Sequence, residues 1–296
     1  MHCDVFRHLP AGRQETEDGS RIGPALALGA SLSWGFADFF GPLKGRALGT
    51  LGVLFTAQIA GLIGIALAVA IRGQGPGGAA ILLAIPASLS GTLGLYAFYR
   101  GMAVGAMSVV APIAGVSAAV PVAVGLATGD HPSALQIVGI FLALVGVALA
   151  SREHQAGERR VAAGVGLALL AALGFGGYFV PMHAAGDADF WWASLLFRAT
   201  SFSLVAVTAL ALRSSVRVSR GDAVFVAAVG LGDMLGNFLF AASSNHGLVS
   251  VTSVLASLYP IVTVVLARFV LGERVDRFQE AGIVGTLAGV VLISTG

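Results

Sequence analysis

The chain has 296 residues, of which 56% are hydrophobic and 11% are charged, and its formal net charge is +2. Soluble domains carry about 25% charged residues, so this composition, with a mean hydropathy of +0.88, excludes a soluble globular domain and makes the bilayer the solvent. The small net charge does not favour nucleic-acid binding, and the single cysteine, Cys3, excludes an intramolecular disulfide.

Residues 1–21 are polar and mixed in charge, which predicts a disordered N-terminal tail without a cleavable signal peptide. Beyond the tail, apolar residues recur in blocks of about 20, each long enough as an α-helix to cross a hydrocarbon core of about 30 Å. We therefore predict an all-α, polytopic membrane protein with ten transmembrane helices. The expected spans are about 22–40, 50–71, 79–99, 106–127, 133–151, 161–182, 190–212, 222–242, 248–271 and 276–295.

The two halves of the chain resemble each other at a shift of 141 to 143 residues. The aligned positions include Trp34 with Phe175, Gly94 with Gly236, and Gly146 with Gly289. Residues 22–151 and 161–296 are therefore predicted to form two five-helix repeats, joined by a linker at 152–160. Because five is odd, the second repeat enters the membrane in the opposite sense, and an inverted repeat places a substrate site between its halves. Two similar bundles of fixed helices are the structural alternative.

The last two spans are joined by the short turn Leu271-Gly272-Glu273-Arg274, which predicts a tight antiparallel hairpin. The ninth span contains Tyr259-Pro260, and its proline cannot donate to the helix ladder and should kink the helix. Together with the glycine-spaced helix that follows (Gly282, Gly285, Gly289), this pattern resembles the end of an EamA-type transporter repeat, from the drug/metabolite transporter superfamily. The resemblance implies a multi-pass secondary transporter of the bacterial cytoplasmic membrane.

The orientation of the termini is left open by two observations. Lys and Arg are more frequent in the loops on one side of the predicted bundle, and the positive-inside rule then places both termini outside. The family resemblance instead implies that both termini lie in the cytoplasm.

The fifth and tenth spans carry small residues four positions apart, a spacing that lets helix backbones approach closely. The pairs are Gly139/Ala143, Gly146/Ala150 and Gly285/Gly289. These spans are predicted to be packing helices, either against each other or against a second copy of the chain. A homodimer through the fifth and tenth helices is the expected protein partnership, beside the lipid bilayer and a small-molecule substrate.

Polar side chains inside the spans are the candidates for the site, because a charged residue at the centre of a membrane costs about 2.5–3.5 kcal/mol. Asp233 lies near the centre of the eighth span, and Asn237 follows it by one turn on the same face. Arg198 lies in the seventh span, where the repeats of the family often have an arginine. The three residues predict a polar cavity, and the alternative is a buried Arg198–Asp233 ion pair that only satisfies itself. Asp233 is also the predicted proton-coupling residue.

Three aromatic residues complete the predicted substrate site. Trp34 in the first span shares a face with Asp38, although Asp38 is close to the predicted helix end, where a solvated interfacial position is the alternative. Tyr96 lies deep in the third span, and Tyr259 sits at the expected kink, where a loosened backbone can expose carbonyls to a ligand. The substrate-binding residues are therefore predicted to be Trp34, Tyr96, Arg198, Asp233, Asn237 and Tyr259.

Two other classes of function compete with transport. The run Gly230-Leu231-Gly232-Asp233 matches the G-x-G-D signature of intramembrane aspartyl proteases, which need a second aspartate. Asp38 is the only other aspartate plausibly inside a span, but it lacks the expected preceding tyrosine, and the downstream Pro-Ala-Leu element is missing. A non-transporting membrane scaffold or sensor is the second alternative.

The sequence contains no H-E-x-x-H, Walker or Cys/His metal pattern, so no enzyme activity, metal or cofactor is expected. The predicted function is a secondary transporter that exports a small metabolite, an amino-acid-like compound or a drug. It would work by alternating access between the two inverted halves. The repeat favours transport over the two competing classes, because neither of them requires two oppositely inserted halves.

Overall fold

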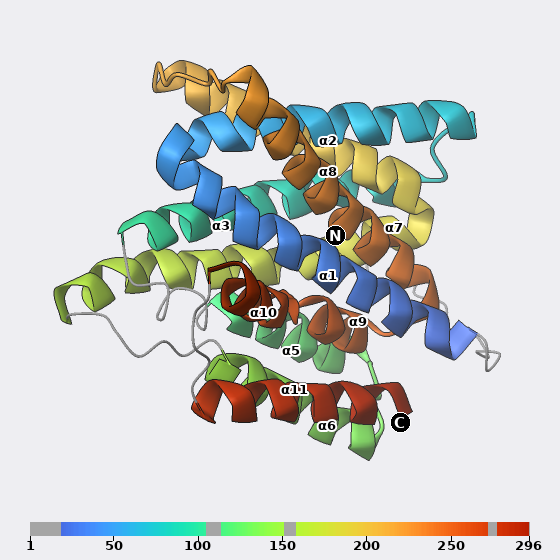
Figure 1. The fold of residues 1–296 in the computed structure, drawn as a ribbon. Coiled ribbons are helices and arrows are strands. Elements are labelled where there is room, and N and C mark those ends of the chain that lie inside the picture. The colour runs from blue at the N-terminus through green and yellow to red at the C-terminus, as the bar shows by residue number, and fades with distance from the viewer. Residues whose placement is uncertain (1–18, 105–113, 151–157, 272–276, 296) are drawn as a thin grey trace, which may run out of the picture.

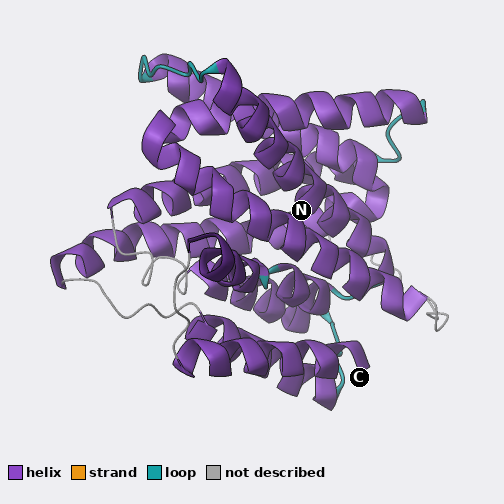
Figure 2. Ribbon diagram, in the orientation of Figure 1, coloured by secondary structure: helices purple, strands orange, loops and turns teal. Residues whose placement is uncertain are grey.

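The computed structural model describes residues 19–104, 114–150, 158–271 and 277–295 (Figure 1). Within these ranges every regular element is a helix and none is a strand (Figure 2). The α-helices are α1 (Gly19–Leu48), α2 (Thr50–Arg72), α3 (Ala84–Val104), α5 (Ala119–Thr128), α6 (Ala134–Ala150), α7 (Glu158–Ala211), α8 (Arg220–Ser243), α9 (Val249–Ala256), α10 (Tyr259–Leu271) and α11 (Arg277–Thr295). Three short 3-10 helices are η1 (Ala79–Leu83), η2 (Val116–Ala118) and η3 (Ser244–His246).

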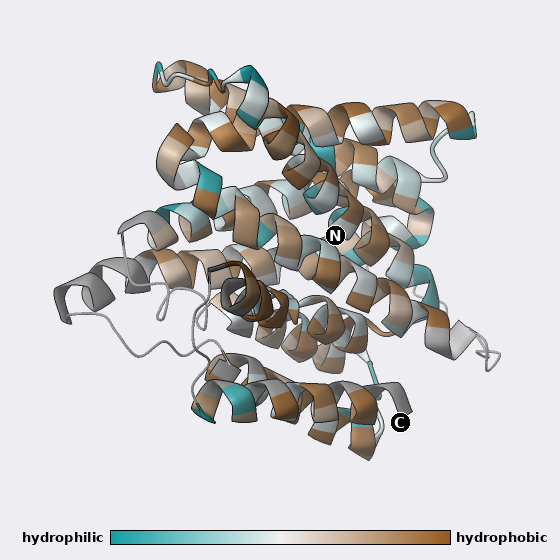
Figure 3. Cartoon of the chain, in the orientation of Figure 1, coloured by the Kyte–Doolittle hydropathy of each residue, from teal (hydrophilic) through white to brown (hydrophobic). Residues whose placement is uncertain are grey.

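The outer surface of the helices is apolar, as the bilayer requires. Large hydrophobic side chains on α2, α7 and α10 are exposed, including Ile71 at 86%, Leu210 at 80% and Phe269 at 80%. Hydrophobic residues dominate the length of the helices (Figure 3). Four described helical stretches are long and apolar enough to cross a membrane: Thr50–Arg72, Ala79–Met102, Gly166–Ala211 and Arg220–His246. The chain is therefore an integral, multi-pass membrane protein.

Helices cover the described parts of the predicted spans, with some boundaries shifted. Helix α1 begins at Gly19 and α7 at Glu158, so residues 19–21 and 158–160 are helical and not part of a tail or linker. A helix satisfies its own backbone hydrogen bonds and can continue from the hydrocarbon into headgroup water. The rest of the predicted tail and linker, part of the fourth span, and the turn after Leu271 lie outside the described residues.

Helix α1 is longer than the sequence predicts, and this changes the position of Asp38. The helix is 30 residues long and ends at Leu48, so it includes Gly41 and Pro42. Both residues are buried, and Gly41 packs against the Tyr99 side chain, so tertiary contacts hold the helix where the local sequence favours a stop. The prediction that Asp38 lies near a helix end is therefore wrong.

The helices pack in pairs that draw distant parts of the sequence together (Figure 1). Helix α1 packs against α8 and α10, α3 against α7, α5 against α9, and α6 against α11. Glycines lie at the closest crossings. A Cβ atom on Gly174 would come within 2.5 Å of Gly94 Cα, where α7 crosses α3, and one on Gly236 would come within 2.5 Å of the Trp34 ring, where α8 crosses α1.

Helices α6 and α11 form a separate pair at one side of the bundle (Figure 1). A Cβ on Gly289 would lie 2.7 Å from the Gly139 carbonyl oxygen, and one on Gly146 would lie 2.6 Å from the Thr286 backbone nitrogen. Any side chain at these two positions would clash, so the helices can approach this closely only because both positions are glycine. In lipid, where no hydrophobic effect drives helices together, such backbone contact holds them by close packing. The predicted packing of these two spans against each other is confirmed.

Helix α7 contains a break at Asp189, between the predicted sixth and seventh spans. Asp189 has an extended backbone (φ −167°, ψ 99°) inside an otherwise helical run. Its carboxylate accepts hydrogen bonds from the backbone N–H groups of Trp191 (3.1 Å) and Trp192 (3.3 Å), so it caps the helix that follows. Arg72 at the end of α2 donates to the same oxygen at 2.6 Å. One oxygen of Asp189 thus both caps the helix and forms the ion pair with Arg72.

We expect Asp189→Ala to lower the stability of the folded protein by about 1–2 kcal/mol, because the helix loses its cap and Arg72 loses its partner. Asp189→Asn should recover most of this loss, since an asparagine caps about as well as an aspartate. Thermal unfolding of both variants in the same detergent measures the difference. Equal melting temperatures for wild type and Asp189→Ala would show that the cap contributes nothing.

Candidate functional site

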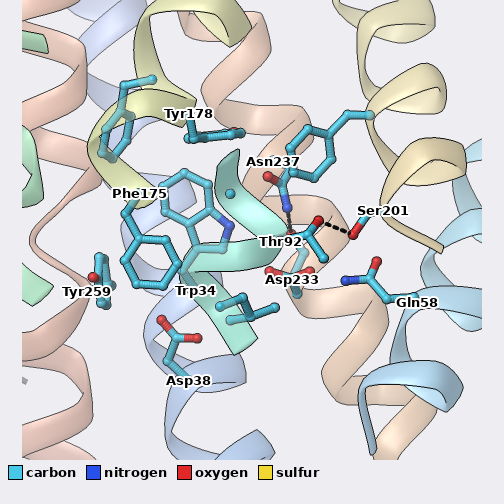
Figure 4. A pocket seen from close by; sticks show the side chains of 14 residues that line it. Trp34, Asp38, Gln58, Thr92, Phe175, Tyr178, Ser201, Asp233, Asn237 and Tyr259 are labelled. Atoms are coloured by element: carbon cyan, nitrogen blue, oxygen red, sulfur yellow. Dashed lines mark hydrogen bonds between the residues drawn. The ribbon is translucent and has the colours of Figure 1, made fainter. Parts of the chain in front are cut away.

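A cavity of about 60 Å³ lies between α1, α2, α3, α7, α8 and α10. This is several times the roughly 10–15 Å³ that one water molecule needs. Its polar lining consists of Asp38, Gln58, Thr92, Ser201, Asp233 and Asn237, and its aromatic lining of Trp34, Phe175, Tyr178, Phe179, Phe197 and Tyr259 (Figure 4). The lining comes from helices of both halves of the sequence. The site is therefore central to the bundle and depends on the contact between the halves.

An ion pair forms one wall of the cavity. Arg198 Nη1 donates to Asp233 Oδ2 at 2.8 Å and also to the side-chain oxygen of Gln58. The Arg198 side chain is only 1% exposed, whereas that of Asp233 is 19% exposed and lines the cavity. Asp233 therefore faces the space, and Arg198 lies behind it. Among the described residues, nothing accepts a hydrogen bond from Arg198 Nε or Nη2.

A glycine makes room for the buried guanidinium group. A Cβ on Gly61 of α2 would lie 3.2 Å from Arg198 Nε and 3.1 Å from the Gly230 carbonyl oxygen of α8. An added Cβ would be in tight contact with both, so a bulky side chain at this crossing would push α2 away from Arg198 and α8. Gly61 thus allows Gln58, one turn earlier on α2, to reach the Arg198–Asp233 pair.

The other polar lining residues are held by hydrogen bonds that span the helices. Thr92 of α3 and Ser201 of α7 share a hydrogen bond of 2.7 Å between their hydroxyl oxygens. Asn237 Nδ2 donates to the backbone carbonyl of Asp233 at 2.7 Å, one turn earlier on α8. This hydrogen bond does not use the amide oxygen of Asn237, which is available to accept a hydrogen bond in the cavity.

The aromatic wall is a network of edge-to-face contacts, which aromatic rings favour. The Trp34 and Tyr178 ring centroids are 5.8 Å apart at 76°, and those of Phe175 and Tyr259 are 6.3 Å apart at 82°. The Tyr178 hydroxyl is buried and makes no hydrogen bond with any described residue. The rings therefore present a rigid apolar wall with at least one free hydroxyl.

Tyr259 reaches the cavity because the predicted kink is present. Helix α9 ends at Ala256 and α10 begins at Tyr259, with Pro260 as the second residue of the new helix. Proline is well tolerated in the first turn of a helix, where its missing N–H has no partner to lose. The break redirects the chain so that Tyr259, only 4% exposed, packs beside Phe175.

Asp38 lies at the base of the cavity, one turn after Trp34 on α1. Its side chain is directed toward the space near Trp34 and Phe175 (Figure 4). The residue is 7% exposed. Among the described residues it has no ion-pair or hydrogen-bond partner. It is therefore a buried carboxylate in the cavity, and not an interfacial one.

Four of the six predicted site residues line this one cavity: Trp34, Asp233, Asn237 and Tyr259. Arg198 is in contact with the lining through Asp233. Tyr96 is not among the lining residues and instead packs into a hydrophobic cluster with Phe98 and Phe175. The lining face of α3 is formed by Gly91, Thr92 and Leu95, and Tyr96 lies about 100° further round the helix than Leu95.

The sequence-based site lacks Gln58, Thr92 and Ser201, which line the cavity. Gln58 could have been found from its position, because an amide near the middle of a strongly apolar span needs a hydrogen-bond partner. Thr92 and Ser201 carry no such signal, since a hydroxyl inside a helix can bond to the carbonyl four residues earlier. Only the crossing of α3 and α7 pairs them.

Comparison with known proteins identifies a family for the second half of the chain. Residues 162–295 match the EamA-like transporter family, which confirms the resemblance seen in the sequence. A solved crystal structure with 15% sequence identity has a TM-score of 0.69, with 94% of this chain and 96% of that chain covered. At this identity the similarity shows the fold alone. No curated protein matches the chain.

Proposed function

We propose that this protein is a secondary transporter of the cytoplasmic membrane. Residues 162–295 match the EamA-like transporter family, whose members are membrane transporters and not enzymes. The protein exports a small metabolite, an amino-acid-like compound or a drug by alternating access. The observation that carries the proposal is the central cavity, because it places two carboxylates, two amides and an aromatic wall inside the bundle. Polar groups at that depth are costly and mark substrate and ion pathways.

The packing of the helices supports two repeats related by a pseudo-two-fold axis, and the odd number of spans predicted for each half makes this an inverted repeat. Gly94 of α3 contacts Phe175 of α7, and its counterpart Gly236 of α8 contacts Trp34 of α1, the counterpart of Phe175. The same contact is thus made twice, with the roles of the two halves exchanged. A pseudo-two-fold axis between the halves requires this exchange, and it places the substrate site on the axis.

Ion pairs at the two ends of the bundle support alternating access. Lys44 of α1 binds Asp222 of α8 at 2.7 Å, near the start of α2, and Arg72 binds Asp189 of α7 at 2.6 Å, at the end of α2. Each pair joins one half of the chain to the other. In the proposed cycle, opening either side of the transporter breaks the ion pair on that side.

Asp233 is the proposed proton-coupling residue. It faces the cavity and neutralises Arg198, so a proton that binds to it also releases the guanidinium group. Protonation would therefore change the contact between α7 and α8 at the same time as the charge of the cavity. This couples a proton to the helix packing that alternating access must change.

The intramembrane-protease alternative has one observation in its favour, because Asp38 and Asp233 line the same cavity. An aspartyl dyad works by sharing one proton between two carboxylates. Asp233 Oδ2 instead lies 2.8 Å from Arg198 Nη1, so its partner in the structure is a cation and not a second carboxylate. The pair therefore favours a transport site over a protease.

Purified protein reconstituted in proteoliposomes tests the proposal against a panel of cationic, zwitterionic, anionic and neutral metabolites and drugs, with and without a pH gradient. At least one compound should accumulate, and the gradient should increase the rate. A folded protein that moves none of them under any gradient would contradict transport and favour the scaffold or sensor alternative.

A further inference from the structure

The cavity holds more negative than positive charge. Its lining includes two carboxylates, Asp38 and Asp233, and no cationic side chain. Arg198 Nη1 lies 2.8 Å from Asp233 Oδ2, so Arg198 compensates the charge of Asp233 although it does not line the cavity. Lys44 and Arg72, near the two ends of α2, are paired with Asp222 and Asp189. Asp38 therefore remains without a compensating charge from any described residue.

An uncompensated carboxylate inside a membrane protein is costly, so the site gains stability from any cation that it can bind. Desolvated inorganic cations such as Na⁺ need about six oxygen ligands in a shell, as hard cations do. The surroundings of Asp38 are instead aromatic: Trp34 lies one turn earlier on α1, and Phe175 and Tyr259 pack across the cavity. Aromatic faces beside a carboxylate match an organic ammonium group, which the ring quadrupoles attract.

The cavity offers little to an anionic group. Arg198 is 1% exposed and does not line the space. The Thr92 and Ser201 hydroxyls are bonded to each other, and the Asn237 amide nitrogen is bonded to the Asp233 backbone. The donors that remain free in the cavity, such as the Tyr178 hydroxyl, are neutral, so an anionic group would meet no cationic side chain and would lie beside two carboxylates.

We propose that the transported substrate is an organic cation whose amine or ammonium group binds between the Asp38 carboxylate and the rings of Trp34, Phe175 and Tyr259. The inference rests on the proposed transport function and narrows it to one substrate class. Asp38 supplies the charge that selects the cation, and the rings exclude water and hold its apolar body. Asp233 of α8 stays in its ion pair with Arg198.

Calorimetric binding to the purified protein in detergent tests the charge requirement. The probes are phenethylammonium, the neutral 2-phenylethanol and the anionic phenylacetate, which share a ring and a short chain, with tetramethylammonium as a smaller cation. At least one cation should bind at least tenfold more tightly than the neutral and anionic probes. Equal binding of all charge types, or no binding of either cation to folded protein, overturns the proposal.

Variants test the role of Asp38. Asp38→Asn should weaken cation binding at least tenfold, and Asp38→Glu should retain part of it, because the charge remains. Asp38→Asn should unfold at the same temperature as wild type or a higher one, since no partner is left unpaired. Asp187→Asn, an exposed carboxylate outside the cavity, is the matched control and should bind like wild type. Unchanged cation binding in Asp38→Asn overturns the assignment.

The proteoliposome panel separates this inference from the proposed function. Transport of neutral or anionic compounds without any cation would leave the transporter standing and reject the cation site. Transport of a cation that Asp38→Asn abolishes would support both. A failure of every compound would reject both.

Discussion

Replacing Gly289 with leucine will separate α11 from α6, and we expect a large loss of folded yield. The Cβ atom alone would lie 2.7 Å from two backbone atoms of α6, the Gly139 oxygen and the Ala143 nitrogen. Backbone atoms cannot rotate away as a flexible side chain can, so the helices must move apart. Overpacking of this kind costs about 1–3 kcal/mol or more.

Alanine substitutions on the same helix supply the control. Gly289→Ala should already be destabilising, because the added carbon is the one that clashes. Gly285→Ala, one turn earlier, would make only ordinary contacts at 3.8 Å and should be neutral or stabilising, since alanine favours a helix by about 1 kcal/mol over glycine. Yield, thermal unfolding and size-exclusion elution measure the effect. A Gly289→Leu variant that is unchanged in all three would contradict the packing role.

The second large effect is expected at Asp233. Asp233→Asn should abolish transport driven by a pH gradient and leave substrate exchange largely intact, because asparagine cannot take up a proton but can still accept the hydrogen bond from Arg198. Gradient-driven uptake and counterflow, measured in the same proteoliposomes, separate the two activities. Gln58, which also binds Arg198, helps to hold the guanidinium group in the variant.

The structural alternative for Asp233 predicts a different result. If its only role is to neutralise Arg198, the single variant should fold poorly, since breaking a buried ion pair costs about 3–5 kcal/mol. The double variant Asp233→Asn/Arg198→Gln should then regain folded yield, because neither charge is left alone. An Asp233→Asn variant that transports normally at every pH would rule out both roles.

Local patterns in the sequence predicted the features that depend on the bilayer and on single helices. The apolar blocks identify the membrane as solvent because each helix must satisfy its backbone inside lipid, whatever its neighbours are. The break before Pro260 follows from a missing N–H, and the shared face of Asp233 and Asn237 follows from helix geometry. The spacing of Gly289 with Gly285 marked a packing helix, since only small residues permit backbone contact.

The tertiary structure decided what no single helix contains. Helix α1 continues past Gly41 because Tyr99 packs there, and this places Asp38 in the cavity. The rotation of α3 turns Thr92 inward and Tyr96 into a hydrophobic cluster, although both are polar-tipped residues of one span. The choice of α6 as the partner of α11 depends on contacts across more than 130 residues of sequence. The rotation and pairing of each helix depend on the packing energy summed over several neighbouring helices. Small differences in this energy leave no periodic pattern in the sequence.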